Sequence, residues 1–327
     1  MNAAEQQPHW SEQKERGSFF ALRFMLFLYR CGGKWICRLL VYPIVLYFFL
    51  TGTRARRASR KYLTRLYHAA PDHAGLARPP GTRDVLRHFI EFGTTCIDRL
   101  DAWTGCIKRT DVIWPNRQVL IDQARAKQGG VLIGTHLGCM DLLRGVASQL
   151  PDLKINALVF IDHAQHFNRM FRIANPGITM QLISVKSFTP DVALMLADKV
   201  EKGEFVVVLA DRIPAGARDR VEWIPFLGHD APWPTGPMLL ASLMNCPVFL
   251  IFCLRKTGRQ YEVYLEHFEN ENLALPRKSR RAALQGAIDR HARVVERYCG
   301  LAPYQWFNFY DFWADRHVDG KQDDRTR

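Results

Sequence analysis

A histidine and an aspartate stand close together at a turn between two predicted elements. Asp141 follows His136 by five positions, and Gly138 lies in the turn between them. A neutral imidazole takes a proton from a substrate hydroxyl, while a carboxylate on its other ring nitrogen fixes the tautomer and stabilises the imidazolium. We therefore predict that His136 is a general base and that Asp141 orients it. A histidine that only satisfies the turn is the alternative.

The elements around this turn predict an open α/β sheet. Val131–Ile133 is a short apolar run between glycines, which indicates a buried strand, and a helical pattern begins after the turn. His136 would then lie at the carboxyl end of a strand, where such sheets bind their ligands. Asp211 and Arg212 follow the apolar stretch Glu204–Leu209 in the same way, so we expect them at the same sheet edge. The arginine there would bind phosphate or polarise a carbonyl; a structural Asp–Arg pair is the alternative.

The rest of the chain alternates between apolar stretches and helical patterns. This order predicts an α/β fold with a mostly parallel central sheet flanked by helices. The further predicted strands are Ile155–Phe160, Gln181–Val185, Pro247–Leu254 and a more exposed edge strand at Tyr261–Glu266. The predicted helices are Asp84–Asp101, Gln118–Lys127, Gln165–Ile173, Pro190–Glu201, Gly236–Asn245 and Arg280–Cys299.

The amino-terminal part of the chain is basic and apolar at once. The net charge is +13, and between Gly17 and Ala70 there are ten Lys and Arg residues but no Asp or Glu. These charges alternate with large apolar residues, which favours an anionic lipid surface over nucleic acid. The apolar runs of Ser18–Leu50 are short: sixteen helical residues cover about 24 Å, against about 30 Å of hydrocarbon. They predict either insertion into one leaflet or a marginal span, and a helical hairpin buried on the rest of the protein is the alternative.

We accordingly divide the chain into four parts. Residues 1–17 are predicted to be a disordered tail, 18–61 a membrane-associated helical segment, 62–315 the main domain and 316–327 a charged tail. The eight cysteines contain no Cys-x-x-Cys pair, which fits a reduced compartment. Cys139 is a candidate nucleophile, although a small residue that fills the turn is the simpler interpretation. His163 and His166 lack an evident third ligand, so no metal site is predicted.

Five blocks of sequence resemble one known family. His136-x-x-x-x-Asp141 resembles the signature of the glycerolipid and lipid A acyltransferase superfamily. The basic-apolar amino terminus and three later blocks are similar to its lipid A late-acyltransferase branch of lauroyl and myristoyl transferases. The later blocks are Leu209–Pro214, Trp223–Gly228 and Pro303–Tyr310. Two parts of the chain, around Tyr42–Gly52 and Asn308–Trp313, look more like a side branch associated with aryl polyene or other fatty-acid-derived lipids.

The resemblance implies an O-acyltransferase at the cytoplasmic face of a bacterial inner membrane. It implies an acyl-acyl carrier protein as donor, a lipid as acceptor, and no cofactor, metal or nucleic acid. By the same resemblance, Phe226 and Gly228 would line the acyl and acceptor groove in an aromatic loop. We interpret the aromatic block Gln305–Tyr310, near the carboxyl end, as packing and not as a contact to substrate. We expect the oxyanion site at backbone N–H groups near Gly138 or at Arg212. The candidate substrate-binding residues are Gly138, Arg144, Asp211, Arg212, Phe226 and Gly228. A non-catalytic membrane-binding protein that retains the fold is the alternative function.

Overall fold

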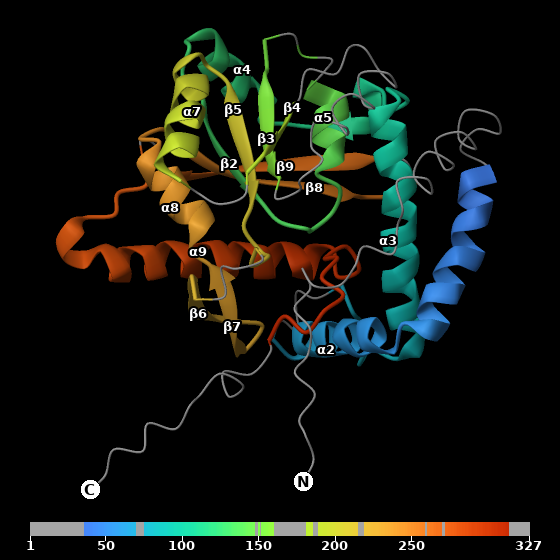
Figure 1. Cartoon of the computed structure of the whole chain (residues 1–327). Coiled ribbons are helices and arrows are strands. Elements are labelled where there is room, and N and C mark those ends of the chain that lie inside the picture. Colours follow the sequence, from blue (N-terminus) through green and yellow to red (C-terminus); the bar gives the residue numbers. More distant parts are fainter. Residues whose placement is uncertain are drawn as a thin grey trace, which may run out of the picture.

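The protein is built around a seven-stranded sheet surrounded by helices (Figure 1). The computed structural model describes residues 36–69, 75–147, 150, 152–159, 181–185, 189–214, 219–258, 260–269 and 272–313. The strand order is β1-β9-β8-β2-β5-β3-β4, and every neighbouring pair is parallel except β8 and β9. The predicted α/β class with a mostly parallel sheet is thus confirmed.

The strands that the sequence predicted are present with small changes at their ends. Each residue of the central strand β2 is buried between β5 and β8. The stretch predicted as an edge strand is β9, and only the two residues of β1 pair on its outer side. The strands are β1 (Val112–Ile113), β2 (Gly130–Gly134), β3 (Ile155–Val159), β4 (Gln181–Ser184), β5 (Phe205–Leu209), β8 (Val248–Arg255) and β9 (Tyr261–Glu269).

The helices also follow the predicted pattern, except that the predicted helix Gln165–Ile173 lies outside the described residues. Short 3₁₀ turns cover Arg109–Asp111 and Arg277–Ser279. The helices are Ile36–Thr51, α2 (Thr53–Ala69), α3 (Thr82–Trp103), α4 (Arg117–Arg125), α5 (Asp141–Ala147), α7 (Pro190–Glu201), α8 (Gly236–Leu243) and α9 (Arg280–Leu301).

The aromatic stretch predicted as a loop is instead a β-hairpin. β6 (Val221–Phe226) pairs antiparallel with β7 (His229–Pro234) through the two-residue turn Leu227-Gly228. Both turn residues have positive φ angles, 51° and 76°, which is the combination that closes a tight hairpin with the twist of its strands. The sequence prediction was wrong because prolines are rare inside sheets. In a two-stranded ribbon each strand has an outer edge, where a residue without an N–H group loses no hydrogen bond between strands.

The first two helices of the described chain meet at a right angle. Ile36–Thr51 and α2 are inclined by 92°, and neither helix alone is long and apolar enough to cross a bilayer, although the bent pair passes that test by length and composition. Val41 and Val45 of the first helix pack against α3 at Gly93, where a Cβ atom would lie 2.5 Å from Val45. The helix α2 runs without a break through the boundary predicted at residues 61 and 62.

Two buried histidines predict how the stability depends on pH. Burial lowers the pKa of both His88 and His291 to about 4, from the ordinary 6.5. Both are therefore neutral in the folded protein, and the unfolded chain binds their protons first as the pH falls. The free energy of unfolding should be unaffected by them above pH 6.5 and should decrease between pH 6.5 and 4, by about 3 kcal/mol for each histidine.

The His291→Leu variant isolates one of these contributions. Within the described residues neither ring nitrogen of His291 has a hydrogen-bond partner, so leucine removes the titration without breaking a bond. Urea unfolding of both proteins at several pH values should show that the difference in unfolding free energy grows by about 3 kcal/mol from pH 7 to pH 4. A difference that is constant over this interval would contradict a neutral, buried His291.

Candidate active site

His136 and Asp211 lie beside each other because their strands are neighbours. β2 and β5 pair in parallel, with Gly134 opposite Leu209 at their carboxyl ends. The chain turns after each strand, and the N–H of Ala210 donates to the carbonyl of Gly134 at 2.9 Å, which fixes the two turns together. The prediction that both residues meet at one sheet edge is confirmed.

The carboxylate of Asp211 is fully buried and accepts four hydrogen bonds. Its Oδ1 accepts from Nδ1 of His136 at 2.7 Å, and its Oδ2 accepts from the backbone N–H of the same residue at 3.0 Å. The indole of Trp306 and the amide of Asn308 also donate to Oδ2, at 3.0 and 2.9 Å. A carboxylate on Nδ1 requires a proton there, so the neutral imidazole carries its lone pair on Nε2.

The electrostatics keep this pair in the form that general base catalysis needs. Burial would raise the pKa of the Asp211 carboxyl, but the charge of His136 and its hydrogen bonds outweigh this and hold the pKa well below the ordinary value. Burial and then the charge of Arg212 lower the pKa of His136, against the opposing effect of Asp211. At neutral pH the pair is therefore an ionised carboxylate and a neutral imidazole, whose side chain is 23% exposed.

The structure corrects the predicted partner of the imidazole. Both carboxylate oxygens of Asp141, at the start of α5, bind residues of α3 instead: Oδ2 accepts from Nε of Arg99 at 2.7 Å, and Oδ1 accepts from Nε1 of Trp103 at 3.0 Å. The prediction failed because the partner depends on which helix packs over the turn. Asp141 holds α5 on α3, and Asp211 holds the imidazole.

The segment 305–309 completes the site, although the sequence predicted it only as packing. The N–H of Phe307 donates to the carbonyl of His136 at 2.9 Å, and Trp306 forms a bridge with Leu137. The carbonyl of Trp306 accepts from Nε2 of His88 on α3, at 2.9 Å. Because His88 is neutral, its Nδ1 accepts in turn from the hydroxyl of Ser59 on α2, at 2.9 Å. Of these residues, only the aromatic block was singled out by sequence.

Two of the predicted oxyanion donors, the N–H groups of Gly138 and Cys139, are already used within the fold. The N–H of Gly138 donates to the carbonyl of Gln305, and the N–H of Cys139 donates to the carbonyl of Cys253, both at 2.8 Å. Gly138 has a φ angle of 75° and comes so close to Cys253 that a Cβ atom would collide with its carbonyl. The glycine therefore serves this close approach, and Arg212 is the side-chain candidate for stabilising an oxyanion.

Arg212 is anchored beside the His136–Asp211 pair. Its Nε donates to Oδ1 of Asn308 and its Nη2 donates to the carbonyl of Phe307, both at 2.8 Å. Since Asn308 also binds Asp211, one side chain fixes both the arginine and the aspartate. This arrangement places a cation within electrostatic reach of His136, where it lowers the pKa of the imidazole.

Three further predicted site residues have different surroundings. Phe226 is fully buried against Trp233, Trp306 and Trp313, so it belongs to the aromatic core and does not line a groove. Gly228 is exposed at the tip of the hairpin and lines a cavity beside α2. The side chain of Arg144 lies outside the described residues, as do His163 and His166. No group of side chains suited to a metal ion occurs in the part of the chain that the structure describes.

The chain was compared with protein-family models and with curated proteins. No protein-family model matches the chain, and no curated protein matches it.

The imidazole tautomer is directly testable. In the wild-type protein, ¹⁵N spectra of the His136 ring should show a protonated Nδ1 and an unprotonated Nε2 at neutral pH. Asp211→Asn should abolish this preference and lower the pKa of His136 further, because the charge and hydrogen bond that raise it are lost. Asp141→Asn is the matched control and should leave the tautomer unchanged. The opposite ranking of the two variants would restore Asp141 as the partner.

Proposed function

We propose that this protein is an O-acyltransferase that moves a fatty acyl chain from an acyl-acyl carrier protein to a hydroxyl of a lipid acceptor. The observation that carries the proposal is the His136–Asp211 pair, a neutral and partly exposed imidazole held by a buried carboxylate at the carboxyl edge of the sheet. Nε2 of His136 would take the proton of the acceptor hydroxyl as its oxygen attacks the thioester carbonyl. Arg212 would stabilise the negative charge that develops on that carbonyl oxygen.

Direct attack by the acceptor fits the state of the nearest thiol. Cys139 is only 3% exposed, and burial holds the pKa of its thiol well above the ordinary value. A protonated, buried thiol is a poor nucleophile, because the thiolate is the reactive form. The proposed reaction therefore has no covalent enzyme intermediate. The acceptor oxygen forms its ester bond as the thioester C–S bond breaks, and the imidazolium of His136 gives its proton to the departing thiolate of the carrier.

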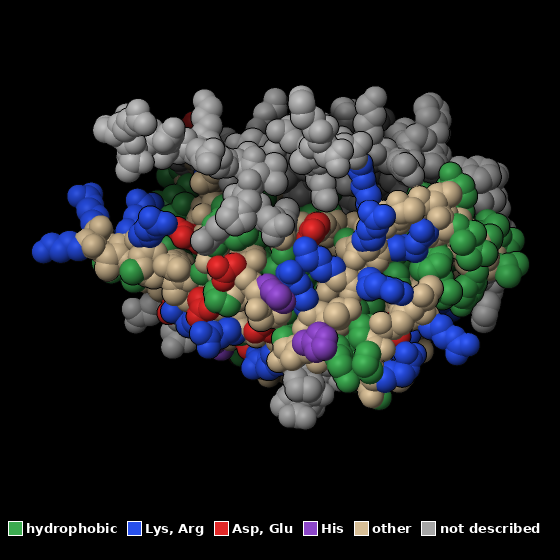
Figure 2. All heavy atoms as spheres, turned by 90° about the horizontal axis from the view of Figure 1, so that it is seen from below, with side chains coloured by type: hydrophobic (Ala, Val, Ile, Leu, Met, Phe, Trp, Pro, Cys, Tyr) green, Lys and Arg blue, Asp and Glu red, His purple; other side chains and the backbone are tan. Residues whose placement is uncertain are grey.

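A lipid acceptor is supported by the surface of the first helix. One face, with Val41, Val45 and Phe49, is buried on the protein. Most of the remaining large apolar side chains are exposed, Leu40 being half-buried. Figure 2 shows hydrophobic side chains gathered at that end of the molecule, with Lys and Arg side chains beside them. These exposed residues are Ile36, Leu39, Tyr42, Ile44, Leu46, Tyr47, Phe48 and Leu50. Such an apolar helix next to a basic one is typical of attachment to an anionic membrane surface.

The donor is proposed from the resemblance and from charge. Carrier proteins of this kind are acidic, and a net charge of +13 would attract them and speed their encounter with this protein. The alternative, a membrane-binding protein without catalysis, would have no need of the buried His136–Asp211 pair.

Replacement of the catalytic pair should abolish transfer. With acyl-carrier donor and extracted bacterial lipids, His136→Ala should show no product, because no group is left to take the proton. Asp211→Asn should be slower by about 10⁴-fold, the cost of a wrongly set imidazole tautomer in related pairs. Asp141→Asn removes the charge of a partly exposed ion pair with Arg99, away from the imidazole, and should stay within about tenfold of wild type.

Mass spectrometry of the product lipid identifies the acceptor. The rate of thioester hydrolysis in the absence of an acceptor is a second measure of activity. Full activity of His136→Ala, with folding verified by circular dichroism, would overturn the catalytic assignment. Absence of both transfer and hydrolysis in the wild type, with any donor, would favour the non-catalytic alternative.

Membrane attachment should depend on the exposed apolar face more than on charge. Washing membranes with high salt should leave the protein bound, whereas detergent should release it, because salt screens only the basic residues. The variant Leu39→Gln/Leu50→Gln should shift protein into the soluble fraction, since these side chains are 73% and 62% exposed. The matched control is Leu243→Gln/Leu301→Gln, at positions 63% and 52% exposed elsewhere. Equal release of both variants would contradict the assignment of this face.

A further inference from the structure

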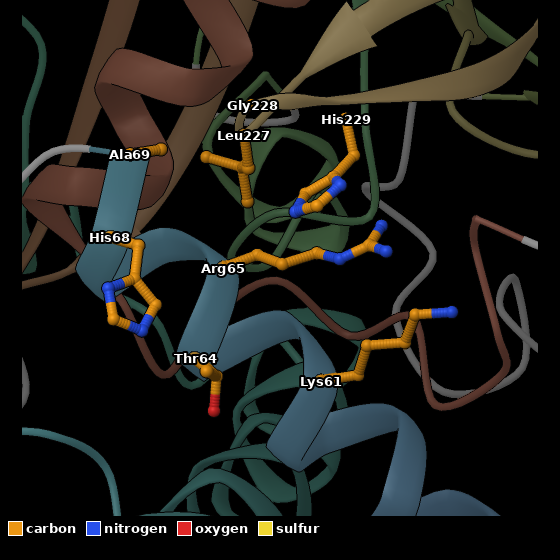
Figure 3. Close-up of a pocket in the computed structure, with 8 residues that line it drawn as sticks. All are labelled: Lys61, Thr64, Arg65, His68, Ala69, Leu227, Gly228 and His229. Carbon is orange, nitrogen blue, oxygen red and sulfur yellow. The ribbon is translucent and has the colours of Figure 1, made fainter.

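A cavity of about 500 Å³ lies between α2 and the tip of the β6–β7 hairpin, outside the active site described above. Lys61 and Arg65 line it from successive turns of α2, together with Thr64 and His68, and His229 lines it from the hairpin. In Figure 3 the side chain of Arg65 extends from α2 toward His229, and that of Lys61 extends to the same side of the helix. None of the lining residues that the structure describes carries a carboxylate.

The basic groups of this cavity are held in place by the carboxyl-terminal segment. The guanidinium of Arg65 stacks over the ring of Trp313, with 4.4 Å between its Cζ atom and the ring centroid. Nζ of Lys61 donates to both oxygens of Asp311, at 2.8 and 2.9 Å. Asp311 thus offsets part of the positive charge, but it orders the lysine at the rim. The charges of Arg65 and Lys61, after burial, lower the pKa of His229, so its ring faces them as a neutral N–H donor.

We propose that this cavity binds the phosphate group of a membrane lipid, with Arg65, Lys61 and His229 as its donors. A phosphate accepts several charge-assisted hydrogen bonds at once, and the planar guanidinium of Arg65 suits two of its oxygens. The cavity has room for a headgroup but is too small for a protein segment of any length. It also opens beside α2, the helix that continues from the exposed apolar helix, so a lipid phosphate at the membrane surface has access to it.

Binding of water-soluble headgroups tests the site without involving acyl transfer, so it can fail independently of the proposed activity. The full-length protein in nonionic detergent is titrated by calorimetry with glycerophosphoglycerol, the deacylated headgroup of phosphatidylglycerol, and separately with inorganic phosphate. The variant Lys61→Gln/Arg65→Gln should lose about tenfold or more in affinity for the headgroup, because charge-assisted bonds are removed. The matched control Arg54→Gln/Arg57→Gln removes the same charge from exposed positions of α2 that do not line the cavity, and should change the affinity by less than about twofold.

A second variant guards against misfolding of the first. Asp311→Asn keeps both cations and removes the carboxylate that competes for Lys61, so it should bind the headgroup more tightly than wild type. Flotation with phosphatidylglycerol vesicles then tests whether the pocket variant also loses membrane affinity relative to the control pair.

Four results would overturn the proposal. An equal loss of headgroup affinity in Lys61→Gln/Arg65→Gln and Arg54→Gln/Arg57→Gln would mean that the basic surface attracts the anion without a specific site. Unchanged affinity in all variants would mean that the cavity binds no anion. Tighter binding of inorganic phosphate than of the headgroup would assign the site to free phosphate. Loss of carrier-protein binding in the pocket pair, with headgroup binding intact, would make the cavity a protein-docking site.

Discussion

The buried carboxylate of Asp211 is the constraint on which the site depends. An ionised group without access to water costs several kcal/mol unless donors surround it. Here the donors are the ring and backbone of His136 from the turn after β2, and Trp306 and Asn308 from a segment almost a hundred residues further along the chain. Once it is buried, the carboxylate stays ionised because these donors surround it, so the geometry of the His136–Asp211 pair and the folding of the carboxyl-terminal segment depend on each other.

That dependence extends to the amino-terminal helices. The carbonyl of Trp306 is held by His88 of α3, whose other nitrogen binds Ser59 of α2. The ring of Tyr62 on α2 also packs on the indole of Trp306, with 4.9 Å between their centroids. The helix α2 is therefore part of the structure that supports the candidate site, and not a detachable anchor. This explains why its central residues are buried although the helix as a whole is strongly basic.

The sequence predicted those features that follow from chain direction. A strand that ends in a turn places its next residues at the carboxyl edge, and this was enough to bring His136 and Asp211 to one place. The partner of the imidazole could not be predicted from the sequence, because Asp141 and Asp211 are equally suitable by residue type. The choice is made by Arg99 and Trp103 of α3, which take both oxygens of Asp141. The sequence alone does not show whether Asp141 or Asp211 binds the imidazole, because the choice depends on how α3 packs over the turn.

The bend between the first helix and α2 joins the exposed apolar helix to the part of the chain that supports the candidate site. Gly52 occupies the bend, where a Cβ atom would lie 2.5 Å from the carbonyl oxygen of Phe48. The guanidinium of Arg56 donates to the carbonyls of Phe49 and Leu50, which the end of the helix leaves unpaired. Gly52 permits the bend, and Arg56 caps the end of the first helix, so the bend is specified by the sequence. It sets the exposed apolar face at a right angle to α2, and the same helix α2 then carries the basic cavity on one side and the contacts to Trp306 on the other. An apolar surface, a basic pocket and the support of the active site are thereby fixed within two successive helices.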